Sequence, residues 1–240
     1  MSFAERRTSI LSRLHAACVA ADRNPAEVRL LAASKTRTPE DVQEALAAGH
    51  RLFGENRAQE LRDKSAALVG HRPMPEWHFI GPLQRNKVRY VVGTATLVHA
   101  VDSVRLAEAI SKRATLLAGR GALSAPVGVL IEVNIGDEAS KAGVAAAEAL
   151  ALARAVDQQP LVDVKGLMCI PPAVAHPDDA APYFAAMAEL AAKGRGEGLA
   201  LTELSMGMSG DFEVAVRYGA TIVRVGTALF GPRRARAVVA

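Results

Sequence analysis

Short apolar segments alternate along the whole chain with segments of helical periodicity, and this alternation constrains the fold more than any other feature. A leading amphipathic helix is expected over residues 5–23, where apolar residues recur every three or four positions. Eight strand-like segments follow, and each of the first seven is succeeded by a helical one: 28–35, 51–56, 76–81, 96–102, 126–135, 161–170, 201–207 and 221–231. In a chain of 240 residues this pattern predicts an α/β fold, a (β/α)8 TIM barrel with an extra N-terminal helix.

The competing α/β architecture is a doubly wound open sheet. Such a sheet usually has fewer strands per domain, and no Gly-x-Gly-x-x-Gly motif follows the first strand here. No linker, low-complexity segment or shift of composition divides the chain. We therefore expect one domain over residues 1–240.

Composition and charge narrow the class of protein. The net charge is +4, but the cationic residues are scattered apart from Arg233, Arg234 and Arg236. No nucleic-acid-binding patch is expected, whereas the mildly basic net charge suits a small anionic ligand such as a phosphate ester. Cys18 and Cys169 are far apart and no Cys/His spacing suggests a metal site, which is typical of a reduced intracellular protein. Neither a signal peptide nor an apolar stretch of membrane-spanning length is seen, so we expect a cytoplasmic protein without membrane contact.

In a barrel of this kind the functional site lies at the carboxyl ends of the strands. Polar residues that end otherwise apolar strands should therefore converge on one face. These residues are Lys35, Asn56, His78, Asn134, Ser205, Ser209, Arg224 and Thr227.

Lys35 ends the first strand-like segment and has two interpretations. A lysine at the end of an interior strand is partly desolvated, which favours a neutral amine that can form a Schiff base with a carbonyl compound. A lysine at the start of a loop can equally be a surface residue whose amine reaches into water. Position alone does not decide between the two.

Two neighbouring loops carry residues suited to a phosphate group. Ser205 and Ser209 follow the seventh strand, and Gly226 and Thr227 follow the eighth. Hydroxyl groups and N–H groups at helix N-termini bind phosphate, and the loops after strands seven and eight are its usual place in this fold. The alternative is that these are ordinary turn residues.

Arg224 lies in a β-branched run, where an arginine is costly to bury without a partner. Strand alternation places it on one face with Ile222 and Gly226, the side expected for a ligand. The alternative is an internal salt bridge with Glu132 or Glu203. Given a phosphate site beside it, ligand contact is the preferred interpretation.

The candidate residues together suggest a class of ligand. His78, taken alone, is more typical of a satisfied core histidine than of a ligand-binding one. An imine-forming lysine and a phosphate cradle at one barrel mouth suit a phosphorylated aldehyde. The candidates are pyridoxal 5'-phosphate, in a binding protein or an enzyme, and a sugar phosphate in a Schiff-base aldolase.

Several motifs are similar to those of a known family. They are AASKTRTPEDVQEALAAGHRLFGENRAQE, WHFIGPLQRNK, VHAVDS, VLIEVNIGDEASKAGV, VKGLMCI and LSMGMSGDFEVAVRYGATIVRVGTALFG. On these motifs the chain resembles, over essentially its whole length, the pyridoxal-phosphate homeostasis proteins of the YggS/PROSC family.

The resemblance implies a barrel of the alanine-racemase N-terminal-domain type that binds pyridoxal 5'-phosphate as an internal aldimine on Lys35. It implies that Arg224 faces the pyridine nitrogen and that Asn56 lines the pocket near the ring. It further implies that the phosphate is held by Ser205, Ser209, Gly226 and Thr227. Two weaker candidates for cofactor contact are His78 and Met206.

Proteins of this family are regarded as carriers or regulators of the cofactor supply that affect vitamin B6 and amino-acid balance, without established catalytic turnover. An arginine at the pyridine nitrogen opposes its protonation and weakens the ring as an electron sink. Related racemases supply a second acid/base residue from another domain, which this chain is expected to lack. The resemblance thus implies a monomeric, non-enzymatic carrier or regulator with pyridoxal-phosphate-dependent apo-enzymes as candidate recipients. A racemase-like enzyme is the alternative.

Overall fold

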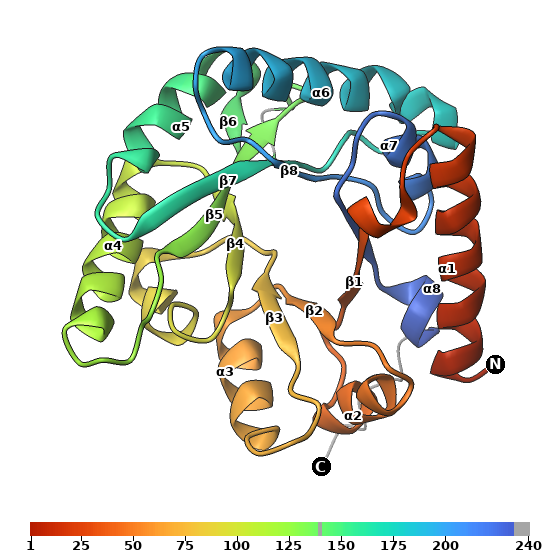
Figure 1. Cartoon of the computed structure of the whole chain (residues 1–240), viewed down its shortest axis with the longest axis horizontal. Helices are drawn as coiled ribbons and strands as arrows, with labels where there is room; N and C mark the ends of the chain where they lie inside the picture. The colour runs from red at the N-terminus through yellow and green to blue at the C-terminus, as the bar shows by residue number, and fades with distance from the viewer. Residues whose placement is uncertain (139–140, 233–240) are drawn as a thin grey trace.

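The computed structural model describes residues 1–138 and 141–232, which contain a closed barrel of eight parallel strands. Around the barrel the strands follow the order β4, β3, β2, β1, β9, β8, β7 and β5, and a pairing between β4 and β5 closes the circle (Figure 1). The strands are β1 (Arg29–Ala33), β2 (Leu52–Glu55), β3 (Glu76–Phe79), β4 (Leu97–Val101), β5 (Val127–Asn134), β7 (Val162–Cys169), β8 (Glu203–Ser205) and β9 (Ile222–Val225). The predicted TIM barrel is confirmed.

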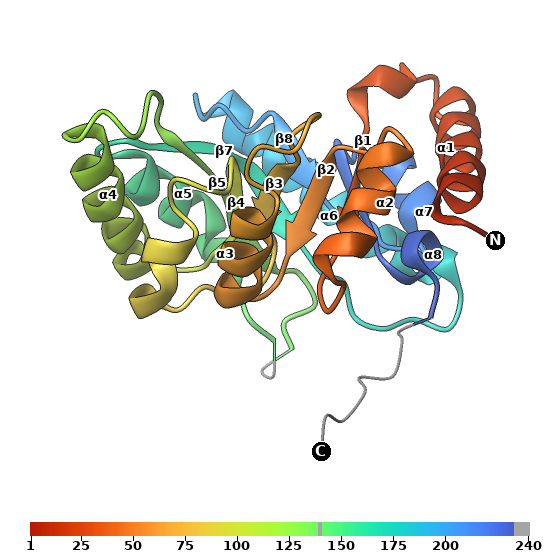
Figure 2. The same cartoon turned by 90° about the horizontal axis from the view of Figure 1, so that it is seen from below.

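Helices cover the outside of the barrel (Figures 1 and 2). The leading helix α1 (Phe3–Ala20) begins at Ser2, which forms a capping box with Glu5, and α2 (Pro39–Ala47) begins at its predicted N-cap, Thr38. None of the helices in the described part of the chain has the length and apolar character needed to cross a membrane. The other helices are α3 (Ala58–Ala67), α4 (Val104–Ala118), α5 (Ala149–Asp157), α6 (Ala181–Gly196), α7 (Phe212–Arg217) and α8 (Thr227–Phe230), with short 3-10 helices η1 (Pro25–Glu27), η2 (Arg85–Tyr90), η3 (Ala146–Glu148) and η4 (Pro177–Ala180).

Two hydrophobic clusters stabilise the barrel. The larger cluster lies between the sheet and the helices and includes Phe53, Phe79 and Phe184. The smaller cluster fills the barrel interior with Leu31, Leu52, Leu97, Ala100, Leu130, Met168 and Ile222. Because side chains alternate along a strand, Ile222 belongs to the interior cluster whereas Val223 and Val225 belong to the outer one, as predicted.

The structure corrects three of the expected elements. Val144–Ala145 does not begin a helix but forms a two-residue strand, β6, beside the end of β5. The segment after β3 forms the 3-10 helix η2. The expected eighth strand ends at Val225, because the chain leaves strand geometry at Gly226 (φ −113°, ψ −82°) and α8 follows. The cationic group of Arg233, Arg234 and Arg236 lies outside the described residues.

Candidate functional site

The carboxyl ends of the parallel strands share one mouth of the barrel, on the lower side of Figure 2. Most of the predicted site residues lie at this mouth or one step inside the barrel. At the strand ends and in the loops that leave them are Lys35, Asn56, Asn134, Ser209, Gly226 and Thr227. Ser205 and Arg224 lie inside the barrel, whereas the His78 side chain faces the opposite mouth and the Met206 side chain packs in the outer cluster.

Lys35 lies in the turn between β1 and α2, and its side chain is exposed, as in the second of the two interpretations that the sequence left open. The turn is held on both sides. The N–H of Thr36 donates to Glu60 Oε2 at 2.9 Å, and the Arg37 guanidinium donates to the carbonyl oxygen of Gly231 at 2.5 Å. Lys35 itself has no hydrogen bond or ion pair with any described residue. Its amine is therefore available for reaction while the main chain that carries it is held in place.

A buried cluster directly before Lys35 escaped the sequence analysis. Ser34 Oγ donates to Glu55 Oε1 at 2.6 Å, while Lys64 Nζ donates to the same oxygen at 2.6 Å and to the Ser34 carbonyl oxygen at 2.8 Å. Burial raises the pKa of Glu55, and the neighbouring Lys64 opposes that rise. Its sequence signal was weak: Lys64 follows the apolar Leu61 by three residues on one helix face. The cluster fixes the end of β1 against β2 and α3.

Asn56 follows β2 and presents an unsatisfied polar atom. The Oδ1 atom of its amide is buried and has no hydrogen-bond partner among the described residues. Such an atom costs about 1–3 kcal/mol unless a ligand or water satisfies it. The loop after β3 packs tightly here, because a Cβ atom at Gly81 would lie 2.3 Å from the Asn56 carbonyl oxygen. The main chain at Asn56 is thus closely packed, and its unsatisfied amide oxygen suits a polar group of a ligand in the mouth.

Several main-chain N–H groups at the mouth have no hydrogen-bond acceptor in the described part of the chain, among them those of Ser209, Gly210, Gly226 and Thr227. Their two loops are adjacent, because the Arg224 N–H donates to the Gly207 carbonyl oxygen at 2.9 Å. Gly207 has a φ of 92°, and a Cβ atom there would lie 2.7 Å from that of Ala215, so glycine is required. Clustered N–H donors of this kind form an anion-binding concavity.

Arg224 lies inside the barrel just below these loops and is 6% exposed. Its Nη1 donates to the carbonyl oxygen of Ser205 at 2.7 Å and to Ser205 Oγ at 2.5 Å, and its Nη2 donates to the carbonyl oxygen of Cys169 at 2.8 Å. The internal salt bridge considered from the sequence is not formed among the described residues, and Glu203 pairs with Arg29 instead. Burial lowers the pKa of Arg224, but a guanidinium starts so far above neutrality that it stays charged.

Glu132, on β5, is a second buried ionisable group inside the barrel. Burial raises its pKa to about 7, with a smaller contribution from the charge of Asp102, while Arg224 opposes the rise. Its carboxyl group therefore exchanges a proton near neutral pH. From the sequence, Glu132 was a candidate salt-bridge partner of Arg224 and formed no convincing acid/base pair with Asp137.

Ser205 begins a chain of hydrogen bonds through the barrel interior. Its Oγ lies 2.9 Å from His99 Nδ1, and His99 Nε2 lies 2.9 Å from His78 Nδ1. At the far end, His78 Nε2 lies 3.4 Å from Glu76 Oε1. Burial lowers the pKa of both histidines, which favours neutral rings.

The direction of this chain follows from its ends. Arg224 can only donate, and the Glu76 carboxylate can only accept. One arrangement satisfies every atom between them: Ser205 accepts from Arg224 and donates to His99, and both imidazoles carry their proton on Nε2. The tautomers of two buried histidines are thus set by an arginine at one end and a carboxylate at the other.

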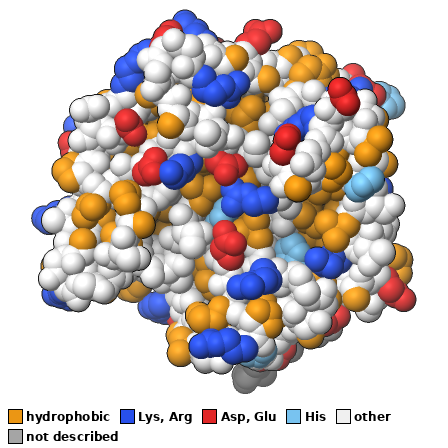
Figure 3. Space-filling model, viewed as in Figure 1, with side chains coloured by type: hydrophobic (Ala, Val, Ile, Leu, Met, Phe, Trp, Pro, Cys, Tyr) orange, Lys and Arg blue, Asp and Glu red, His pale blue; other side chains and the backbone are white. Residues whose placement is uncertain are grey.

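His78 and Met206 are the two predicted contacts that the structure does not bring to Lys35. The His78 side chain faces a cavity of about 230 Å³ at the opposite mouth, where the strands begin, together with Arg29, Glu76, Lys165 and Glu203. Figure 3 looks onto this face, and side chains of both charges gather around its centre. Met206 lies in the outer cluster, because alternation after Ser205 turns its side chain away from the interior.

Sequence relatives match the chain over nearly its full length. Residues 17–234 match the family model described as alanine racemase, N-terminal domain. The chain is 44% identical over 235 residues to the pyridoxal phosphate homeostasis protein of Aquifex aeolicus, covering 98% of this chain and 100% of the relative. It is 38% identical to the protein of the same name from Escherichia coli K12, covering 96% of each.

Solved structures are also similar to this chain over most of its length. PipY of Synechococcus elongatus, with PLP bound, superposes with a TM-score of 0.81 at 36% identity, covering 95% of this chain and 100% of PipY. Alanine racemase of Corynebacterium glutamicum superposes with a TM-score of 0.65 at 17% identity, covering 96% of this chain and 63% of the racemase. The likeness to the racemase is one of fold alone.

Proposed function

The chain belongs to the family of the alanine racemase N-terminal domain and, within it, to the pyridoxal phosphate homeostasis proteins, and we propose that it binds pyridoxal 5'-phosphate at the carboxyl-terminal mouth of its barrel. A related structure has this compound bound. The observation that carries the proposal is the group of N–H donors without acceptors, in loops beside the strand that leads to Lys35. A phosphate group would satisfy those donors.

Each mouth residue has a part in this proposal. Ser209, Gly226 and Thr227 hold the phosphate through N–H and hydroxyl groups. The Lys35 amine forms a Schiff base with the aldehyde, so that a carbon–nitrogen double bond forms and the aldehyde oxygen leaves as water. The buried amide oxygen of Asn56 accepts a hydrogen bond beside the ring.

Arg224 faces the pyridine nitrogen in this proposal, and its charge opposes protonation there. Bound pyridoxal phosphate supplies an electron sink, which is weaker when that nitrogen is unprotonated. Ser205, whose hydroxyl is engaged by both Arg224 and His99, suits the orientation of Arg224 better than the phosphate contact predicted from the sequence.

We infer storage or delivery of the cofactor rather than turnover as the role of this binding. The relatives are named as homeostasis proteins, and the charge of Arg224 disfavours carbanion chemistry. The remaining parts of this proposal are a single cytoplasmic domain acting as a monomer, an effect on amino-acid balance, and apo-enzymes that use the cofactor as recipients.

Reaction of added pyridoxal phosphate with the purified protein tests this proposal. We expect visible absorbance in the wild type, its loss in Lys35→Ala, and its retention in Lys193→Ala, a matched change of an exposed lysine on α6. Borohydride reduction followed by peptide mass spectrometry should then locate the adduct on Lys35. A wild-type protein that stays colourless, or an adduct on another lysine, would contradict the proposed site.

A racemase-like activity is the second candidate, favoured by Glu132. A carboxyl group with a pKa of about 7 suits general acid–base exchange at neutral pH. Incubation of the loaded protein with a panel of amino acids in D₂O, followed by NMR detection of Cα deuteration, separates the candidates. Turnover at ordinary enzyme rates that disappears in Glu132→Gln would replace the carrier role with an enzymatic one.

A further inference from the structure

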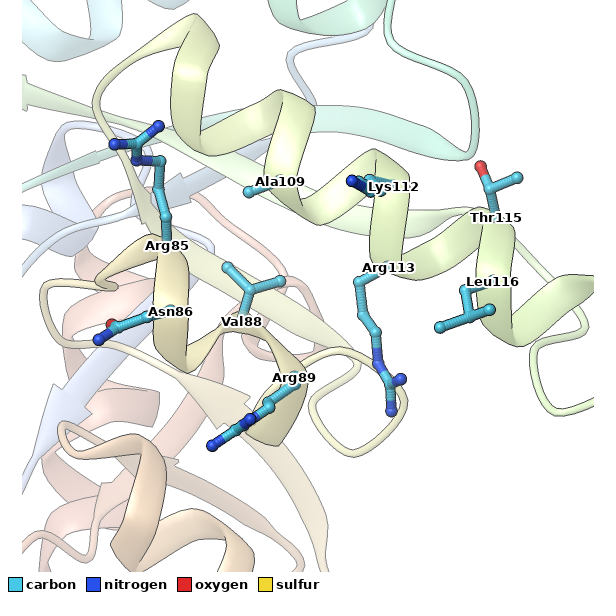
Figure 4. A pocket seen from close by; sticks show the side chains of 9 residues that line it. All are labelled: Arg85, Asn86, Val88, Arg89, Ala109, Lys112, Arg113, Thr115 and Leu116. Atoms are coloured by element: carbon cyan, nitrogen blue, oxygen red, sulfur yellow. The ribbon is translucent and has the colours of Figure 1, made fainter.

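A groove on the outside of the barrel lies between η2 and α4 and shares no lining residue with the proposed cofactor mouth (Figure 4). Its volume is about 600 Å³, within the roughly 300–1,000 Å³ range typical of small-molecule sites. Val88, Ala109 and Leu116 form an apolar floor between the two helices. Leu116 is 46% exposed, which leaves apolar surface open to an occupant.

Positive charge is concentrated around this floor. Arg85 and Arg89 line the groove from η2, and Lys112 and Arg113 line it from α4, with no carboxylate among the lining residues. The two helices together contain six lysines or arginines and one glutamate, a net charge of +5 compared with +4 for the whole chain. Cations that are scattered in the sequence therefore converge on one side of the barrel.

Three of these four cations have no partner within the described ranges. The side chains of Arg85, Lys112 and Arg113 form no hydrogen bond or ion pair there, and the buried Nε atom of Arg113 lacks an acceptor. Arg89 donates to the Tyr90 hydroxyl at 2.6 Å and stacks on its ring. Like charges held together without counter-charges favour an anionic occupant.

We propose that this groove binds a small organic polyphosphate of nucleotide size. Its phosphate groups lie among the guanidinium and ammonium groups, since planar guanidinium groups bind phosphate oxygens in pairs. Its flat apolar part lies on the floor formed by Val88, Ala109 and Leu116. The volume favours this occupant over a free phosphate, which would leave the floor uncovered.

Isothermal titration calorimetry with ATP tests the groove. We expect Lys112→Gln to weaken binding about tenfold and Lys193→Gln to leave it unchanged, although both remove one charge from an exposed lysine. Leu116→Ser should weaken ATP but leave inorganic triphosphate unaffected. NMR shifts in the same titration should fall on η2 and α4 rather than on the loops after β8 and β9.

Three results would overturn the proposal. One is an absence of ATP binding at millimolar concentration. Another is an equal loss in Lys112→Gln and Lys193→Gln, which would indicate attraction to net charge alone. The third is binding of an acidic peptide to the groove without binding of ATP, which would make it a protein-docking surface. The result is independent of the cofactor mouth, because Lys112 lies on α4 and the NMR shifts distinguish η2 and α4 from the loops after β8 and β9.

Discussion

Replacement of His99 by leucine should break the hydrogen-bond chain that runs from Arg224 to Glu76. The Ser205 hydroxyl would lose its acceptor and Nδ1 of His78 would lose its donor, both in the barrel interior. Each buried group left unpaired costs about 1–3 kcal/mol, so we expect the free energy of unfolding to fall by roughly 2–5 kcal/mol. Urea denaturation with an unchanged m value measures this loss.

The matched variant is His99→Gln, which keeps one acceptor and one donor at the same position. It should recover at least half of the stability lost in His99→Leu, and it should keep the visible absorbance of bound pyridoxal phosphate, which we expect to shift in His99→Leu as Arg224 loses its orientation. Nitrogen-15 NMR of the wild type should find both imidazoles neutral with the proton on Nε2. A proton on Nδ1 of either ring, or equal stability of the two variants, would refute the direction that we assign to the chain.

Three further predictions concern other buried groups. The Glu132 carboxyl has a pKa of about 7 when folded and about 4.5 when unfolded, so its stabilising contribution is complete below pH 4.5 and is lost as the pH rises to 7. The free energy of unfolding of the wild type should therefore decrease between pH 4.5 and pH 8, and Glu132→Gln should make this decrease roughly 3 kcal/mol smaller, as measured by urea denaturation. Lys64→Met leaves Glu55 buried without its cation and should cost about 3–5 kcal/mol in thermal unfolding, whereas adding Glu55→Gln should restore most of it. Gly207→Ala should cost about 1–3 kcal/mol because of its positive φ and the contact with Ala215, and should weaken pyridoxal phosphate binding in an absorbance titration; unchanged affinity would argue against the phosphate loop.

The barrel was predictable because its signals are local. Strand-like and helical periodicities are properties of short windows, and eight alternations leave few architectures for a chain of this length. Boundaries were less predictable: the expected eighth strand continued to residue 231, but the chain turns at Gly226 and forms α8. A valine-rich pattern does not reveal where a strand leaves the sheet.

The site was predictable where it depends on which residues follow the strand ends. It was less predictable where it depends on the direction in which a side chain points from its strand. Ser209, Gly226 and Thr227 fall in adjacent loops because β8 and β9 are neighbours. The sequence did not show that the His78 side chain faces the opposite mouth or that the Met206 side chain packs outside the barrel, because these depend on the level and the face that each side chain takes on its strand. His99 and the Glu55–Lys64 pair were missed because their partners come from distant segments that one sequence cannot pair.

The last strand of the barrel, β9, pairs with β1 on one side and β8 on the other, with Leu31 in register with Arg224. The lysine of the proposed site therefore follows the first strand of the barrel, whereas Gly226 and Thr227 follow the last. A growing chain cannot assemble the mouth until Thr227 has emerged, so cofactor occupancy reports that the ring of strands has closed. A ligand that contacts the residues after β1 and after β9 holds these two strands together. Its release should therefore weaken the contact between β1 and β9 first.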